Sequence, residues 1–400
     1  MTSTQHSAPA YPFGAYERLD LHPRYGELRS TEPVARVAMP YGGECWLVTG
    51  YQEARVVFAD PRFSRAATVG REDVARLTPQ PLSARSLLGM DPPEHTRLRR
   101  LVAKAFTLRQ VERLRPRAQE IVDGLLDTME AGGQPADVAS TLAWPLPVTV
   151  ICELLGVPTD DRNRFLAWTE QSLSPSAAGV QDVAAALAEL HKYMGELVDA
   201  RSGEPGDDLL GELIKARDEG DRLTHPELVE FGVVLLVAGY RTTANQVGNM
   251  LFTLLSQPQL WQQLLDDRTL VPRAVDELLR HIPLTVGTTF PRVATEDVEL
   301  GGKLIKAGDT VAVHHHVASR DESVFDRGDE IDLGRAHNPH LAFGHGPHHC
   351  VGASLARMEL GVALDTLLRR FPGLRLAVPA DEVPWQEGLI RGVKQLPVRW

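Results

Sequence analysis

One long helix constrains the fold of this chain more than any other segment. Thr224 and Glu227 have the spacing of a capping box, in which the two side chains satisfy backbone N–H groups at the start of a helix. The apolar-rich run that follows contains no proline until Pro258. We expect a helix of about 32 residues, roughly 48 Å long. Because its first half is apolar on all sides, it should pass through the centre of the molecule.

The remaining segments predict a mainly α chain with small sheets. Asp91 and Glu94 repeat the capping-box spacing and predict a second helix that ends near Phe106. Alternation and turn residues predict short strands near the N-terminus and in the last third of the chain. The expected elements are helices over 91–106, 224–256, 271–281 and 351–371, and strands over 34–38, 45–49 and within 298–317.

Composition excludes several classes of protein. The net charge of -11 argues against nucleic-acid binding, which requires basic surface. The sequence has no leader pattern and no apolar stretch long enough to cross a bilayer, so we expect no membrane partner. Three scattered cysteines do not suit a disulfide framework and allow one functional thiol. We therefore expect a single cytoplasmic domain over 1–400.

The segment FGHGPHHCVG, residues 343–352 and called here the cysteine loop, has the properties of a thiolate site. The helix expected after it directs its positive N-terminal dipole toward Cys350, which lowers a thiol pKa. Gly346 and Gly352 would permit a tight turn and a close approach of backbone to a flat cofactor.

The spacing of Phe343, Gly346, Cys350 and Gly352 resembles the haem-binding pattern of the cytochromes P450. This resemblance implies a mainly α cytochrome P450 fold, a helical prism with small β-sheets, and haem b (iron protoporphyrin IX) bound through Cys350. A thiolate on haem iron favours O–O bond cleavage. The other two cysteines, Cys45 and Cys152, are expected to be packing residues.

Two further sets of residues match the family. Glu277 and Arg280 form the Glu-x-x-Arg motif, which the family combines with an arginine matched by Arg335 in a partly buried charge network. Haem propionates require cationic or hydrogen-bonding partners. The resemblance assigns that role to His95, Arg99, Arg292 and His348.

In the long helix, Ala238, Gly239 and Thr242 match the family's oxygen-activating segment, where Thr242 can bond back to the Ala238 carbonyl. Arg241 stands where the family usually has an acid, and arginine is a poor proton relay. Three interpretations stay open for Arg241. It pairs with an acidic surface residue, it binds an anionic or hydroxyl-rich part of a substrate, or it accompanies an atypical oxidation.

The resemblance also implies an apolar or amphipathic small-molecule substrate. Its pocket would draw on 66–90, 161–197 and 284–289, with particular contacts from Phe231, Val234, Leu235, Ala238, Val286, Leu389 and Ile390. Electrons from NAD(P)H would arrive through a separate ferredoxin and ferredoxin reductase. The basic face of Arg97, Arg100 and Lys104 suits an acidic ferredoxin. If residues 314–316 form a strand, His314 and His316 lie on the same face and could bind one metal ion.

Three functions remain open. The leading hypothesis is hydroxylation or epoxidation of a polyketide, terpenoid or peptide in secondary metabolism, such as antibiotic biosynthesis. A second is oxidative coupling, desaturation or rearrangement with the same oxidant. A third, from a different class, is a haem-binding sensor or carrier without turnover.

Overall fold

The computed structural model describes residues 8–14, 16–79, 81–82, 87–161, 164, 167–168, 180–206, 208–218, 223–288 and 290–400. Its contacts divide the chain into two compact units. The first unit comprises Met1–Thr96, Glu277–Asp332 and His337–Cys350. The second comprises Arg97–Asp276, Leu333–Ala336 and Val351–Trp400.

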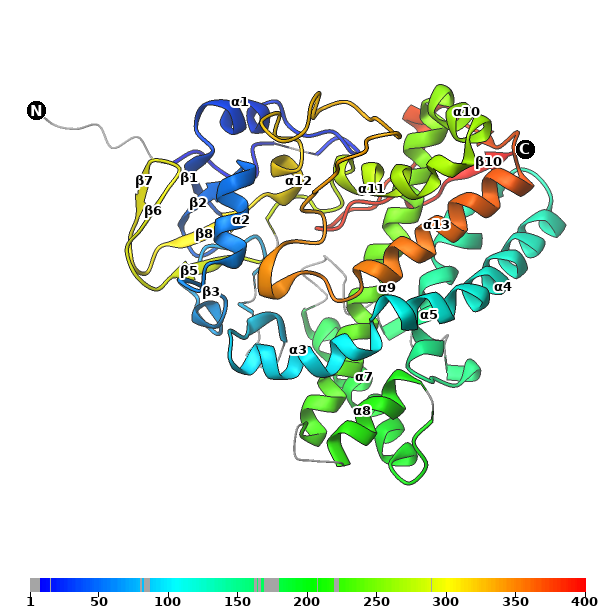
Figure 1. Cartoon of the computed structure of the whole chain (residues 1–400), viewed down its shortest axis with the longest axis horizontal. Coiled ribbons are helices and arrows are strands. Elements are labelled where there is room, and N and C mark those ends of the chain that lie inside the picture. The colour runs from blue at the N-terminus through cyan, green and yellow to red at the C-terminus, as the bar shows by residue number, and fades with distance from the viewer. Residues whose placement is uncertain are drawn as a thin grey trace, which may run out of the picture. The chain divides into compact units, whose positions relative to one another are not determined.

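Helices form most of the described chain, as expected (Figure 1). They are α1 (Arg24–Thr31), α2 (Tyr51–Ala59), α3 (Glu94–Ala105), α4 (Leu108–Gly132), α5 (Pro145–Leu154), α7 (Val180–Arg201), α8 (Leu209–Asp218), α9 (His225–Ser256), α10 (Pro258–Asp266), α11 (Val271–His281), α12 (His315–Ala318) and α13 (Ala353–Arg370). A short 3-10 turn, η7, covers Gly346–His348.

The first unit contains a five-stranded sheet in the order β1-β2-β8-β5-β3, with α2 packed beside β8 (Figure 1). Only the β2–β8 pairing in this sheet is parallel. The unit also holds the β6–β7 hairpin, and the second unit holds a sheet in the order β4-β10-β9. The strands are β1 (Val34–Ala38), β2 (Glu44–Val48), β3 (Phe63–Ser64), β4 (Ala136–Asp137), β5 (Arg292–Ala294), β6 (Val298–Leu300), β7 (Lys303–Ile305), β8 (Thr310–Val313), β9 (Arg375–Leu376) and β10 (Pro397–Arg399).

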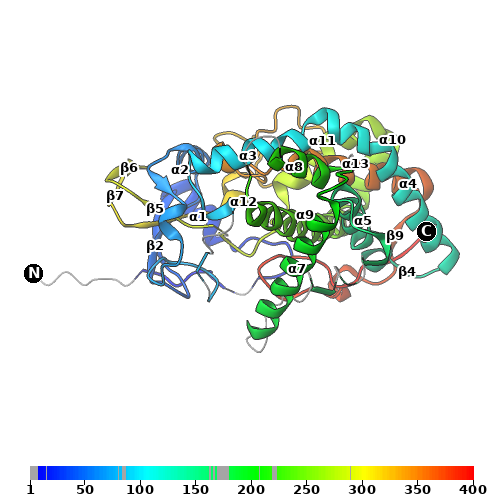
Figure 2. The same ribbon diagram turned by 90° about the horizontal axis from the view of Figure 1, so that it is seen from below.

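Helix α9 is the core of the second unit, where it packs against α5, α7 and α13 (Figure 2). Its predicted capping box is confirmed, with Glu227 N–H donating to Thr224 and Thr224 N–H donating to Glu227. Burial along α9 is greatest in its second half, a detail that the sequence did not reveal. Residues 243–255 are continuously buried, although they include Asn245, Gln246 and Asn249. The docking of other helices, which no local pattern reveals, decides which half is covered.

Two local predictions were wrong. Asp91 does not cap α3 with its side chain. Its carboxylate instead accepts hydrogen bonds from the backbone N–H groups of Arg65 (2.9 Å) and Ala66 (3.3 Å). His315 and His316 lie in α12 rather than in a strand, because β8 ends at Val313. The described residues contain no group of three metal-ligating side chains around these histidines or elsewhere.

No helix in the described part of the chain is both long and apolar enough to cross a membrane.

Candidate functional site

The cysteine loop ends immediately before α13, with Gly352 as the residue preceding the first helical turn. Two backbone bonds close it, from Cys350 N–H to the Phe343 carbonyl (2.8 Å) and from His349 N–H to the Gly346 carbonyl (3.0 Å). Cys350 is exposed, whereas Cys45 and Cys152 are buried. Burial raises the pKa of Cys45 to about 12. Cys350 is therefore the cysteine whose position suits a reactive or ligating thiolate.

Gly346 is required for a reason that the sequence did not reveal. It has a φ of +69°, which disfavours other residues. A Cβ at this position would come within 2.7 Å of the Phe58 carbonyl oxygen in α2. The structure thus shows a close approach between η7 and α2, and the predicted approach of Gly346 to a cofactor stays a prediction. This fit holds the Gly346 end of the cysteine loop against α2.

Arg292 on β5 has the properties expected of a carboxylate partner. Its Nη1 donates to the Phe63 carbonyl (3.1 Å), and its Cζ lies 5.7 Å from the centre of the Phe58 ring. Within the described chain, its buried Nε and Nη2 atoms have no hydrogen-bond partner. Burial lowers the pKa of Arg292 to about 10, so the side chain stays protonated at neutral pH. A buried cation with two unsatisfied donors fits a carboxylate such as a haem propionate.

Two other predicted propionate partners lie in the same unit as Arg292. The rings of His95 and His348 are 4.1 Å apart, and His95 is buried. Phe58 contacts Arg292 and approaches Gly346, so it connects β5 with the cysteine loop. Arg99 belongs to the second unit, and its role stays a prediction.

The Glu277–Arg280 pair is confirmed as a fully buried ion pair, 2.7 Å long and 0% exposed on both sides. Arg280 also donates to three backbone carbonyls, and Glu277 accepts two further hydrogen bonds. The carbonyls are those of Ser319, Gly328 and Glu330, and the donors to Glu277 are Asp332 N–H and Asn338 Nδ2. Arg335 lies in the second unit, so its predicted part in this network stays a prediction.

On α9, the Thr242 hydroxyl donates to the Ala238 carbonyl (2.7 Å), as predicted. The helix continues through this bond without a break. Val234, Ala238 and Thr242 follow each other at intervals of four residues on a less buried face of α9. A Cβ on Gly239 would make an ordinary contact of 3.6 Å with Ile151, so packing does not explain this glycine.

Arg241 contacts the C-terminal hairpin, residues 384–394. Its Nη2 donates to the side-chain carbonyl of Gln386 (3.2 Å), a neutral amide. The Gln386 side chain in turn donates to the Val393 carbonyl (3.1 Å). Asn249, further along α9, donates to the Arg391 carbonyl (3.0 Å). Polar side chains of α9 thus attach this hairpin, which carries Leu389 and Ile390.

Comparisons with known proteins give the family of this chain. The family pattern for cytochrome P450 matches residues 260–376. The chain is 52% identical to nocardicin C N-oxygenase of Nocardia uniformis subsp. tsuyamanensis, over 99% of the chain and 100% of that protein. This chain is a cytochrome P450.

Two further relatives of this P450 show the variety of reactions in the family. Mycinamicin IV hydroxylase/epoxidase of Micromonospora griseorubida is 50% identical over 98% of both chains. The crystal structure of cytochrome P450mel 107F1, described as having biaryl coupling reactivity, matches with a TM-score of 0.94 and 47% identity, over 98% of this chain and 100% of that one. The protein is a monooxygenase of the P450 fold, and its family implies a haem-iron cofactor.

The predicted substrate residues are only partly defined. Phe231 and Leu235 are buried, Val234, Val286 and Ile390 are half-buried, and Leu389 is exposed. Thr289 and parts of 66–90 and 161–197 lie outside the described residues.

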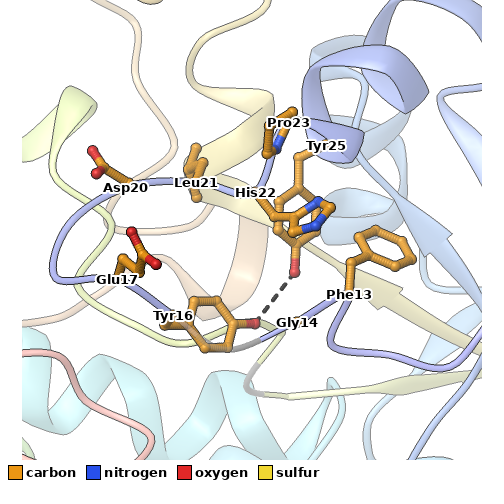
Figure 3. A pocket seen from close by; sticks show the side chains of 9 residues that line it. All are labelled: Phe13, Gly14, Tyr16, Glu17, Asp20, Leu21, His22, Pro23 and Tyr25. Atoms are coloured by element: carbon orange, nitrogen blue, oxygen red, sulfur yellow. Dashed lines mark hydrogen bonds between the residues drawn. The ribbon is translucent and has the colours of Figure 1, made fainter.

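A surface pocket of about 260 Å³ lies near the N-terminus, and the Tyr16 and Tyr25 hydroxyl groups are 3.2 Å apart beside it (Figure 3). It is lined by Phe13, Gly14, Tyr16, Glu17, Asp20, Leu21, His22, Pro23 and Tyr25. None of the predicted substrate residues lines this surface pocket.

Two charged residues were missed in the sequence. Arg65 is buried next to β3, and its relation to Arg292 depends on strand register, which no local pattern shows. Glu359 is buried on α13, and burial raises its pKa to about 8. An acid between the apolar residues Met358 and Leu360 was a visible signal for Glu359.

Proposed function

We propose that this P450 inserts one atom of dioxygen into an apolar or amphipathic natural product, by hydroxylation or epoxidation in a secondary-metabolic pathway. The second oxygen atom leaves as water, with two electrons from NAD(P)H and two protons. The exposed Cys350 in a closed loop before α13 carries this proposal. The printed activities of the N-oxygenase and hydroxylase/epoxidase relatives support it. We also propose that the two units act as one catalytic domain.

We propose that Cys350 ligates the iron of haem b. Arg292, His95, His348 and Arg99 would hold the propionates, and Phe343, Gly346, Gly352, Ala238 and Gly239 would contact the macrocycle. Such a haem supplies dioxygen activation, because the thiolate donates electron density that favours O–O cleavage. The buried, unsatisfied donors of Arg292 support the assignment.

On α9, we propose that the Thr242 hydroxyl holds a proton close to the reacting oxygen. Its bond to the Ala238 carbonyl fixes the orientation of the hydroxyl. The Arg241 guanidinium stays protonated and does not exchange protons readily, so it cannot replace a relaying acid. The substrate would lie against Phe231, Val234, Leu235, Val286, Leu389 and Ile390.

Electrons would come from a ferredoxin and its reductase in the cytoplasm. Arg100 is exposed on α3, in accord with a contact to an acidic protein. Arg97, by contrast, forms an ion pair with Glu227 (2.5 Å), which also caps α9. The side chain of Lys104 lies outside the described residues. Because Arg97 pairs with Glu227, we assign Arg97 to packing within the second unit rather than to ferredoxin binding.

Isotope labelling tests the reaction type. With labelled dioxygen, oxygen insertion predicts that the product gains one labelled atom. The biaryl-coupling relative makes oxidative coupling the second candidate. Coupling predicts a dimeric or cross-linked product without label. A haem protein that is not reduced by any ferredoxin and forms no product would contradict both.

A further inference from the structure

Arg65 and Arg292 are two buried cations that lie close together in the first unit. They are 6% and 4% exposed. Arg65 directly follows β3, and β3 pairs antiparallel with β5, the strand that carries Arg292. Two like charges that lie close together disfavour the charged state of each. Burial lowers the pKa of Arg65 to about 9, and the Arg292 charge acts in the same direction.

The neighbouring carboxylate does not satisfy both cations. Asp91 attracts them electrostatically, but its oxygens accept hydrogen bonds from the Ser64 hydroxyl and from the N–H groups of Arg65 and Ala66. Two positive charges therefore face one negative charge. A second anion would balance this excess.

The donors needed for such an anion are present. In the part of the chain that the structure describes, Nε of Arg65 and Nε and Nη2 of Arg292 are buried without hydrogen-bond partners. Arg65 Nη1 makes one long bond to the Leu88 carbonyl (3.4 Å). The Phe290 ring, centred 5.0 Å from Arg65 Cζ, packs against the guanidinium. Unsatisfied N–H groups on two guanidinium groups suit a carboxylate.

We infer that Arg65 and Arg292 together form a carboxylate-binding site, to which Arg65 contributes an unassigned second guanidinium. This inference rests on the proposed function, since the carboxylate is either a haem propionate or an acidic group of the substrate. Both sources offer the same chemistry to the two arginines. The experiment must therefore distinguish cofactor retention from substrate recognition.

The test compares holoenzymes of Arg65→Gln, Arg65→Lys and the wild type. Arg76→Gln is the matched control, because Arg76 is also buried but already bonds to Glu72 (2.5 Å) and to backbone carbonyls. Arg65→Met replaces Arg65→Gln if the latter does not fold. The first readout is the rate of haem transfer to excess apomyoglobin. The second is the affinity for 4-(imidazol-1-yl)benzoate relative to 1-phenylimidazole, followed in the Soret band.

A propionate at Arg65 predicts that Arg65→Gln loses haem about tenfold faster, since a charge-assisted hydrogen bond contributes roughly that factor. Arg65→Lys should lose it at an intermediate rate, and Arg76→Gln at the wild-type rate. A substrate carboxylate predicts unchanged haem loss and about tenfold weaker binding of the benzoate probe alone. No change in either readout would overturn the site. A wild type without a thiolate-type carbon monoxide spectrum would contradict the proposed function instead.

Discussion

The Arg241 guanidinium donates a hydrogen bond to the side-chain carbonyl of Gln386, 3.2 Å away, and so joins α9 to the C-terminal hairpin. This contact gives Arg241 a structural role at the position where relatives of the family usually have an acid. The two adjacent residues of α9 thus have separate tasks, because Thr242 bonds to Ala238 instead.

A double-mutant cycle should detect the Arg241–Gln386 bond. We expect Arg241→Met and Gln386→Leu each to lower the free energy of unfolding, with a coupling energy of about 1 kcal/mol. Denaturant unfolding of the four proteins measures it. Gln262→Leu, at an exposed site on α10, is the control. Additive effects of the two substitutions would show that the bond does not stabilise the fold.

Thr242→Ala should uncouple electron consumption from product formation, because it removes the hydroxyl proposed to hold a proton. We expect the ratio of hydrogen peroxide formed to NAD(P)H consumed to rise and the rate of product formation to fall about 100-fold, at the lower end of proton-transfer effects. A surrogate ferredoxin and reductase suffice for the assay. Thr242→Ser keeps the hydroxyl and should stay close to the wild type. Equal peroxide yields from the alanine and serine variants would remove Thr242 from proton delivery.

Glu277→Gln should destabilise the protein strongly, because it leaves the Arg280 charge buried without its partner. The expected loss in free energy of unfolding is about 3–5 kcal/mol. The Arg268–Asp365 pair is 42% and 40% exposed, so Arg268→Gln should cost about 1 kcal/mol or less. Urea unfolding compares the two variants. Similar losses in the two variants would mean that burial of the Glu277–Arg280 pair does not increase the energetic cost of breaking it.

Glu359 should make stability depend on pH. Burial raises its pKa from the ordinary 4.5 to about 8, so folding favours the protonated acid. Its stabilising contribution is complete below about pH 4.5 and is lost as the pH rises toward 8. At 1.36 kcal/mol per pKa unit, the full loss is on the order of 5 kcal/mol.

Glu359→Gln tests this pH dependence, since the amide cannot ionise. Unfolding measured between pH 5 and 8 should show a flatter profile for this variant than for the wild type. Glu189→Gln, at an exposed site on α7, should leave the profile unchanged. A Glu359→Gln profile as steep as that of the wild type would rule out Glu359 as the cause.

Local patterns predicted the elements well but not their long-range contacts. The capping box at Thr224, the 271–281 helix and the Glu277–Arg280 pair depend on residues three or four positions apart, which the sequence shows directly. The bond from Arg241 to Gln386 and the fit of Gly346 against Phe58 join residues far apart in the chain. The Asp91 side chain is a further example of a long-range contact. It accepts a hydrogen bond from Arg65 N–H, 26 positions away, instead of capping α3.

The spectrum of the reduced carbon monoxide adduct tests the central claim most directly. A haem with a thiolate ligand has a strongly red-shifted Soret band, and we predict that band for the wild type and for Cys45→Ser and Cys152→Ser. Cys350→Ser should lack it, because the serine hydroxyl does not replace the thiolate. A wild-type adduct without the red shift, or a red-shifted adduct in Cys350→Ser, would show that Cys350 does not ligate the iron.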